Sequence, residues 1–173
     1  MRIYRKIMDH LARVLFIVTA VMICAMVLII FWQVFSRFVL DKTPRWSEES
    51  TIVLMIYTGF LGATLAYRER LHIGIKFFLL KMKQKTRNRI YFVIDILIGL
   101  FSLFMLIWGT GFAWMMRSQT LPATKIPVGI SYLPIPLAGL MLILFVIEKI
   151  GGDFAERKTG ANNPPLYITE MEV

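Results

Sequence analysis

The sequence has few of the residues on which catalytic and metal sites depend. Its 173 residues include one cysteine, Cys24, and two histidines, so an internal disulfide is impossible and a cysteine-based metal site is disfavoured. Cys24 lies within an apolar run, where we interpret it as a small apolar filler. No glycine-rich loop and no convincing pair of nucleophile and base are present, which argues against an enzyme. Internal repeats are also absent, so the inverted-repeat signature of a self-sufficient transporter is missing.

Apolar residues, by contrast, are abundant and unevenly distributed. They make up 57% of the sequence, and the mean hydropathy is +0.65, whereas soluble domains are about 45–50% apolar. The excess is concentrated in residues 14–35, 50–66, 90–116 and 130–147, which carry a single charged residue, Asp95. A membrane-spanning helix needs about 20 apolar residues. We therefore predict an all-α integral membrane protein with four transmembrane helices, over residues 14–35, 46–66, 90–114 and 131–149.

The first apolar segment has to be distinguished from a cleaved signal peptide. Its uncharged run over 14–35 is longer than the core of about 7–15 residues that is typical of a signal peptide, and no small-residue cleavage site follows it. We interpret it as a retained helix within a single domain over residues 1–150. The glycine- and proline-containing stretch over 151–173 is predicted to be a flexible cytoplasmic tail.

Positive charge is distributed asymmetrically along the chain. The net charge is +9, and lysine and arginine gather before the first apolar segment and between the second and third. Because basic loops stay on the cytoplasmic side, both regions and both termini are expected in the cytoplasm. A basic chain can also bind nucleic acid, but these residues flank apolar spans. That position favours contact with the membrane surface, and we expect no nucleic acid partner.

Two short amphipathic helices are predicted to lie on the membrane surface, over residues 2–12 and 72–86. Apolar residues of the second helix share one face, and basic residues beside them are typical of helices that rest among lipid headgroups. The lysines expected to anchor this helix are Lys76, Lys81, Lys83 and Lys85. In the first helix, Ile3, Ile7 and Leu11 recur every four positions, although an ordinary basic flank explains this segment equally well.

Two adjacent carboxylates, Glu48 and Glu49, stand at the start of the second apolar segment. Thr43 and Pro44 fit a helix N-cap followed by proline at the first helical position. Both glutamates would then lie in the first two turns, where the helix dipole favours anions, with Trp46 at the membrane interface. Helix anchoring or an ion pair with another subunit is favoured over ion coupling, and catalysis is the least favoured role.

Asp95 is the one charged residue within an apolar segment. It would lie about 9 Å into the third span, and intramembrane carboxylates are usually paired or functional. The apolar parts of the other spans contain no cation, so we expect an interfacial lysine or arginine, or another chain, to supply its partner. Structural pairing is favoured over a proton or ion relay. In the second span, Gly59 and Gly62 would permit close helix packing.

Proline is frequent in the third loop and at the start of the fourth span. Pro122, Pro127, Pro134 and Pro136 stiffen this stretch. We expect Pro134 near the start of the fourth helix and a kink at Pro136. A rigid exposed connection suits docking of another protein, although a plain stiff turn would have the same sequence.

Three longer stretches together resemble one transporter family. QVFSRFVLDKTPRWSEES, FLGATLAYRERLHIGI and QTLPATKIPVGISYLPIPLAG are similar to the small, Q-type (DctQ-like) membrane subunit of tripartite ATP-independent periplasmic (TRAP) transporters. The resemblance runs from about Gln33 to Gly139 and includes the four-span layout. Lys76 departs from it, because many relatives are expected to have an acidic residue there.

The resemblance implies a function that composition does not. Such a chain would be the scaffold subunit of a sodium-coupled organic acid uptake system in the bacterial inner membrane, with sialic acid as the suspected substrate. Its partners would be a large elevator-type subunit, which holds the sodium sites, and a periplasmic substrate-binding protein; the chain itself would hold no cofactor or metal. The alternatives are an autonomous dimeric transporter or a membrane sensor.

The resemblance and the residue patterns together give two sets of candidate contact residues. Those expected to contact the large subunit are Arg37, Trp46, Glu48, Glu49 and Asp95. Those expected to contact the binding protein are Pro122, Ala123, Lys125 and Tyr132.

Overall fold

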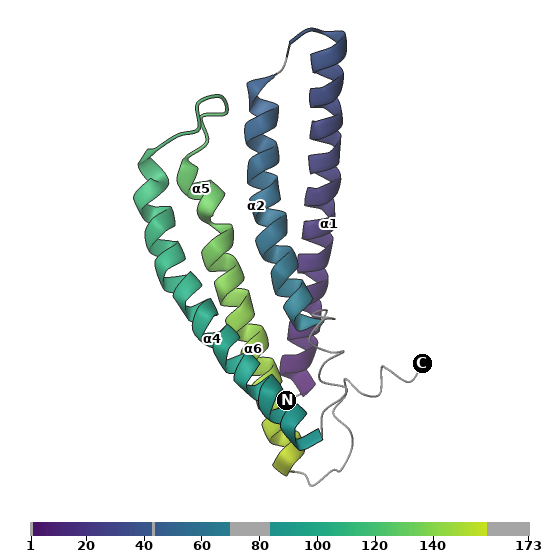
Figure 1. The fold of residues 1–173 in the computed structure, drawn as a ribbon, viewed down its shortest axis with the longest axis vertical. Coiled ribbons are helices and arrows are strands. Elements are labelled where there is room, and N and C mark those ends of the chain that lie inside the picture. Colours follow the sequence, from purple (N-terminus) through teal and green to yellow (C-terminus); the bar gives the residue numbers. More distant parts are fainter. Residues whose placement is uncertain (1, 43, 70–83, 159–173) are drawn as a thin grey trace.

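The computed structural model describes residues 2–42, 44–69 and 84–158 and is built from helices (Figure 1). The four long helices are α1 (Arg2–Val39), α2 (Arg45–Arg68), α4 (Gln84–Met115) and α6 (Pro134–Lys158). A 3-10 turn, η1 (Met116–Ser118), and a short helix, α5 (Val128–Tyr132), connect α4 to α6. Four segments are long and apolar enough to cross a membrane: Lys6–Val39, Arg45–Arg68, Arg89–Ser118 and Val128–Gly151. The predicted all-α, four-span architecture is confirmed.

The long helices form two pairs, α1 with α2 and α4 with α6 (Figure 1). The pairs lie closest at the end where the chain begins and α6 ends, and they diverge toward the other end. We call these the closed end and the open end. At the open end, α5 and the loop before it face α2. Arg2 and Lys158 lie at the same end of the bundle, as an even number of spans requires.

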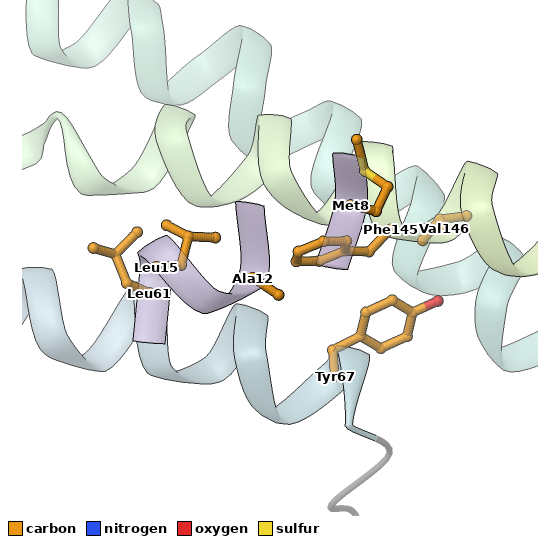
Figure 2. Close-up of a cluster of buried hydrophobic side chains, with 7 residues drawn as sticks. All are labelled: Met8, Ala12, Leu15, Leu61, Tyr67, Phe145 and Val146. Carbon is orange, nitrogen blue, oxygen red and sulfur yellow. The ribbon is translucent and has the colours of Figure 1, made fainter. Parts of the chain in front are cut away.

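The hydrophobic core lies toward the closed end, where three helices meet (Figure 2). Its buried members are Met8, Ala12, Leu15, Leu61, Tyr67, Phe145 and Val146. Met8, Ala12 and Leu15 are spaced by four and three residues, which places them on one face of α1. Ile7, on the apolar face predicted for residues 2–12, is 55% exposed and lies outside this core.

The ends of several predicted segments differ from the structure. Residues 2–12 are the first turns of α1 and not a separate helix, because no glycine or proline interrupts Arg2–Val39. Pro44 occupies the N-cap of α2 and not its first turn, and the Ser47 hydroxyl donates a hydrogen bond to the Pro44 carbonyl at 2.7 Å. Helix α6 continues to Lys158, so the predicted flexible tail is helical over 151–158, where acidic and basic helix-forming residues follow the glycines.

At the fourth span, Pro134 lies at the start of a helix as predicted, whereas the break does not lie at Pro136. The span begins at Val128, and the break between α5 and α6 lies at Leu133, not at Pro136. Pro134 is the first residue of α6 and Pro136 lies in its first turn, where a missing N–H costs no helix hydrogen bond.

Part of the predicted surface helix over 72–86 lies outside the described residues, and with it Lys76, Lys81 and Lys83. Lys85 belongs to the first turn of α4. Residues 159–173 of the predicted tail also lie outside the described part.

Glycines divide into two groups by their surroundings. A Cβ at Gly139 would lie 2.8 Å from the Ser102 carbonyl oxygen and 2.9 Å from the Leu106 nitrogen, so α6 approaches the backbone of α4 closely there. A Cβ at Gly59 or Gly62 would meet no atom within 4 Å. Close packing of α4 on α6 therefore needs its glycine, whereas the α2 glycines face open space.

Candidate interaction sites at the two ends of the bundle

Among the residues that the structure describes, no three side chains of histidine, cysteine, aspartate or glutamate come together as metal ligands. The polar side chains gather instead at the two ends of the helix pairs. One set ties the helices together at the closed end, and the other joins α2 to the third loop at the open end.

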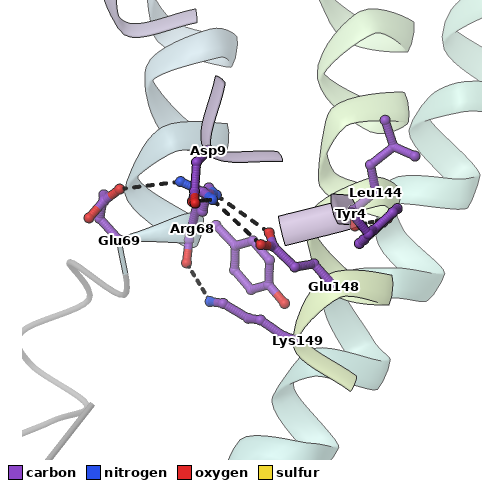
Figure 3. A network of polar contacts seen from close by, with 8 residues as sticks. Tyr4, Asp9, Arg68, Glu69, Leu144, Glu148 and Lys149 are labelled. Atoms are coloured by element: carbon purple, nitrogen blue, oxygen red, sulfur yellow. Dashed lines mark hydrogen bonds and ion pairs between the residues drawn. The ribbon is translucent and has the colours of Figure 1, made fainter. Parts of the chain in front are cut away.

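Arg68, the last residue of α2, is the centre of the closed-end network (Figure 3). Its guanidinium donates to Asp9 of α1 and lies 3.5 Å from Glu148 of α6. Arg68 and Glu148 have side chains that are only 15% and 16% exposed. A contact with Glu69 is longer, at 4.0 Å, and Glu69 is 60% exposed. The shielded part of the network is therefore the Arg68–Glu148 pair, which joins α2 to α6.

Asp95 of α4 is buried close to this network. It is 4% exposed, and the Tyr67 hydroxyl of α2 donates a hydrogen bond to its Oδ1 at 2.7 Å. Lys149 of α6 donates to the Tyr67 carbonyl at 2.7 Å, and its Nζ lies 4.0 Å from the centre of the Tyr67 ring. Tyr67 is therefore a centre through which α2, α4 and α6 are joined.

The partner of Asp95 is Tyr67, whereas the sequence predicted a lysine, an arginine or another chain. A phenol is a neutral donor, and Tyr67 is 28 residues away in the sequence. Structural pairing of Asp95, the favoured interpretation, agrees with this hydrogen bond. Because Asp95 is buried, the contact that it makes lies within the chain, with Tyr67.

Glu49 of α2 holds the third loop at the open end. Its Oε1 accepts a hydrogen bond from the Ala123 N–H at 2.8 Å. Its Oε2 accepts two more from Thr124, from the N–H at 2.7 Å and from the hydroxyl at 2.8 Å. Glu49 and Ala123 were assigned to two different interfaces, and the structure brings them into contact within one chain.

The loop over 119–127 is also ordered by its own backbone. Leu121 donates to the Ile126 carbonyl at 2.9 Å, and Val128 donates to the Gln119 carbonyl at 2.8 Å. Pro122 and Lys125 are exposed on this loop, and Lys125 has a positive φ of 58°. The loop is thus a compact turn and not an open connection.

Tyr132 and Tyr57 fix α5, which follows the loop. Tyr132 is half-buried, and its ring packs edge-to-face on Phe112 of α4 with the ring centres 4.8 Å apart. The Tyr57 hydroxyl of α2 donates to the Ile130 carbonyl at 2.8 Å. Of the predicted docking residues, Tyr132 therefore packs against α4, while Pro122 and Lys125 are exposed.

The remaining candidates lie on the outside of the α1–α2 pair, toward the open end. Arg37 and Glu48 are exposed, and Trp46 is 45% exposed. Glu48 accepts a hydrogen bond from the Gln33 amide at 3.4 Å. Glu48 and Glu49 thus have different surroundings despite being neighbours in the sequence.

Comparison with known families agrees with this architecture. The family model described as "Tripartite ATP-independent periplasmic transporters, DctQ component" matches residues 26–156. The chain belongs to this family. It is the small permease component of a TRAP transporter, a multi-pass membrane protein that takes part in transport and is not an enzyme. The tripartite system implies a large permease and a periplasmic binding protein as its partners.

Individual relatives are distant but extend over most of the chain. The sialic acid TRAP transporter small permease protein SiaQ of Vibrio cholerae is 23% identical over 154 residues, which cover 87% of this chain and 85% of the relative. A putative TRAP transporter small permease protein of Haemophilus influenzae is 22% identical over 147 residues, or 84% of this chain and 91% of that protein. A further similarity, 38% over 56 residues, covers 32% of this chain and 9% of the sialic acid TRAP transporter permease protein SiaT of Haemophilus influenzae.

Proposed function

We propose that this chain is the fixed scaffold subunit of its transporter, which holds a large elevator-type subunit in place and contributes to docking of the binding protein. The observation that carries this proposal is a contrast within the four spans. Polar contacts tie the helices together at both ends, yet most of the surface between the ends is uncovered. A chain whose helices are held together by polar contacts, and whose outer surface is apolar, suits a static support.

The uncovered surface belongs chiefly to three of the four spans. Only 11% of the most apolar stretch of α1 is buried within the chain, and the corresponding shares for the second and third spans are both 17%. For the span that contains α5 and α6 the share is 44%. Large side chains on the outside include Phe31, Phe38 and Trp108, which are 71%, 80% and 68% exposed. Apolar area of this extent requires cover by lipid or by another membrane subunit.

The transported solute and the coupling ion are assigned to the large subunit. We propose sodium-coupled uptake of an organic acid and take sialic acid as the first compound to test, because the Vibrio cholerae relative carries it in its name. Arg37, Trp46 and Glu48 are proposed to contact the large subunit, since all three are exposed on the α1–α2 pair. The basic segments near the closed end are proposed to contact the headgroups of the bilayer.

Co-purification is the direct test of the scaffold role. The tagged chain is extracted from native membranes in mild detergent, and its partners are identified by mass spectrometry. We expect a large multi-span permease in stoichiometric amount. Glu48→Gln should reduce its recovery, whereas Asp41→Asn, which removes one exposed carboxylate from the turn after α1, should not.

Transport by the isolated chain would contradict the proposal. Proteoliposomes that contain this chain alone are expected to show no uptake of labelled sialic acid under a sodium gradient. Those that also contain the large subunit and the binding protein should show it. Uptake by the chain alone would support an autonomous transporter, and recovery of the chain without a permease would refute the scaffold role.

A further inference from the structure

At the tip of the loop over 119–127, two backbone N–H groups take their acceptor from outside the loop. Its lower part is closed by the backbone bonds from Leu121 to Ile126 and from Val128 to Gln119. The N–H groups of Ala123 and Thr124 instead donate hydrogen bonds to the Glu49 carboxylate. Because hydrogen bonds to an ionised acceptor are stronger than neutral ones, this carboxylate dominates the attachment of the loop tip to α2.

The attachment leaves a defined set of side chains on the outside of the loop. Pro122 and Lys125 are exposed, and Ile126 is 36% exposed. Lys125 has φ 58°, a backbone conformation that lysine rarely adopts. Such conformations persist where the surroundings impose them and are frequent at binding surfaces. The cation and the two apolar side chains would fit a protein surface that presents a carboxylate beside an apolar patch.

We propose that Glu49 is a positioning residue that holds this loop, before any partner arrives, in the conformation on which the periplasmic binding protein docks. This proposal rests on the docking role under Proposed function and names the residue that prepares the loop for docking. Glu49 need not touch the binding protein. By ordering the loop in advance it lowers the conformational entropy that docking would otherwise cost.

The alternative is that Glu49 contacts the large subunit directly, as the sequence had suggested. Its surroundings argue for the loop instead. Both oxygens of Glu49 accept hydrogen bonds from the loop, three in total. Glu48, one residue earlier, is exposed and accepts a longer hydrogen bond, of 3.4 Å, from Gln33 of α1. We therefore assign Glu49 to the loop and Glu48 to the outer surface of the α1–α2 pair.

Tryptic cleavage after Lys125 gives a direct readout of loop order. In the purified complex in lipid nanodiscs, Glu49→Gln should increase the cleavage rate at this bond about tenfold, because loss of the charged acceptor favours local opening of the loop. Thr124→Val, which removes the hydroxyl alone and leaves the N–H, should give a smaller increase. Asp41→Asn, which removes an exposed carboxylate outside both proposed contacts, should leave the rate unchanged. Peptides are assigned by mass spectrometry, so cleavage at other lysines does not interfere.

Docking is measured as uptake at increasing concentrations of the binding protein, in proteoliposomes that contain both membrane subunits. For Glu49→Gln we expect the half-saturating concentration to rise about tenfold, because the ordering cost falls on the docking step. The maximal rate and the recovery of the large subunit should be unchanged. A purely structural role would lower the recovery of the large subunit and leave the half-saturating concentration alone.

Each other outcome overturns the proposal in a recognisable way. Faster cleavage without a change in the half-saturating concentration would show that loop order does not serve docking, and the scaffold function would stand. Loss of the large subunit from Glu49→Gln would show a direct subunit contact. If the unaltered chain recruits no permease, the proposed function and this inference both fail. If Glu49→Gln does not fold, the same measurement is made on Thr124→Val. An unchanged half-saturating concentration in that variant would refute the role of the attachment between Glu49 and the loop.

Discussion

The hydrogen bond between Tyr67 and Asp95 allows a quantitative test of what holds the helices together at the closed end. Tyr67→Phe removes only the phenol oxygen, which lies 2.7 Å from Asp95 Oδ1, and retains the ring. Tyr67 and Asp95 are 5% and 4% exposed, so water is poorly placed to replace the lost donor. No other change separates the bond so cleanly from the packing of the ring, on which Lys149 lies at 4.0 Å.

The expected magnitude follows from two opposing considerations. Leaving a buried hydrogen-bonding group without its partner costs about 1–3 kcal/mol in soluble proteins. Hydrogen bonds between membrane helices average about 0.6 kcal/mol, with a maximum of about 1.7, because the unfolded state in the membrane also finds partners. We therefore expect Tyr67→Phe to lower the free energy of unfolding by about 1–2 kcal/mol. For a chain of this size the melting temperature should fall by about 2–8 °C.

The assay is thermal unfolding in one detergent, followed by intrinsic fluorescence, with Asp95→Ala and the double variant measured alongside. The double-mutant cycle should give a coupling energy of about 1 kcal/mol between the two positions. Asp95→Asn is the matched control, because it keeps an acceptor oxygen for the Tyr67 hydroxyl and should cost less than Asp95→Ala. Additive effects of Tyr67→Phe and Asp95→Ala would refute the reasoning, since independent residues do not share a bond.

Two further predictions concern contacts between the helices. Glu148→Gln should lower stability by about 1 kcal/mol, because its pairing with Arg68 is shielded from solvent, whereas Glu69→Gln should change it by less than about 0.5 kcal/mol, because Glu69 is exposed. Equal effects of the two variants in thermal unfolding would contradict the assignment of Glu148 as the shielded partner. Gly139→Ala should lower the free energy of unfolding by about 1–3 kcal/mol, since its Cβ would press on the backbone of α4. Gly59→Ala should instead stabilise the isolated chain by up to about 1 kcal/mol through higher helix propensity. A Gly139→Ala chain as stable as the unaltered one would show that the approach of α6 to α4 is looser than described.

Segment-level properties of the fold were predictable because they depend on composition alone. Four apolar runs of membrane length give four helices whatever their contacts, and residues 90–114 and 46–66 lie within α4 and α2 as observed. The ends of the helices were less predictable where two residues could each have ended a helix. Pro134 and Pro136 could each have broken the fourth span, and the structure places the break before Pro134 because proline is tolerated in the first turn of a helix.

Pairings between helices were not predictable from one sequence. Tyr67 and Asp95 are brought together by the packing of α2 against α4 and α6, and nothing local to either residue indicates it. Glu49 and Ala123 are 74 residues apart, and the helix-start pattern around Glu49 offered a sufficient local explanation for its charge. The inward face of α1 was not predictable for a similar reason, since the row Ile7 and Leu11 and the row Met8, Ala12 and Leu15 are both apolar. Only the neighbouring helices decide which row is buried.

The two groups of glycines have a consequence for how the sequence can vary during evolution. Gly139 meets the backbone of α4 in its own chain, so selection for folding alone should retain a very small residue there, whatever transporter the chain serves. Gly59 and Gly62 meet no atom within 4 Å, and folding of this chain places no such limit on them. If these two positions prove to be conserved among relatives, the constraint must come from a neighbouring molecule, and the few substitutions that occur there should be correlated with those of the surface that covers them.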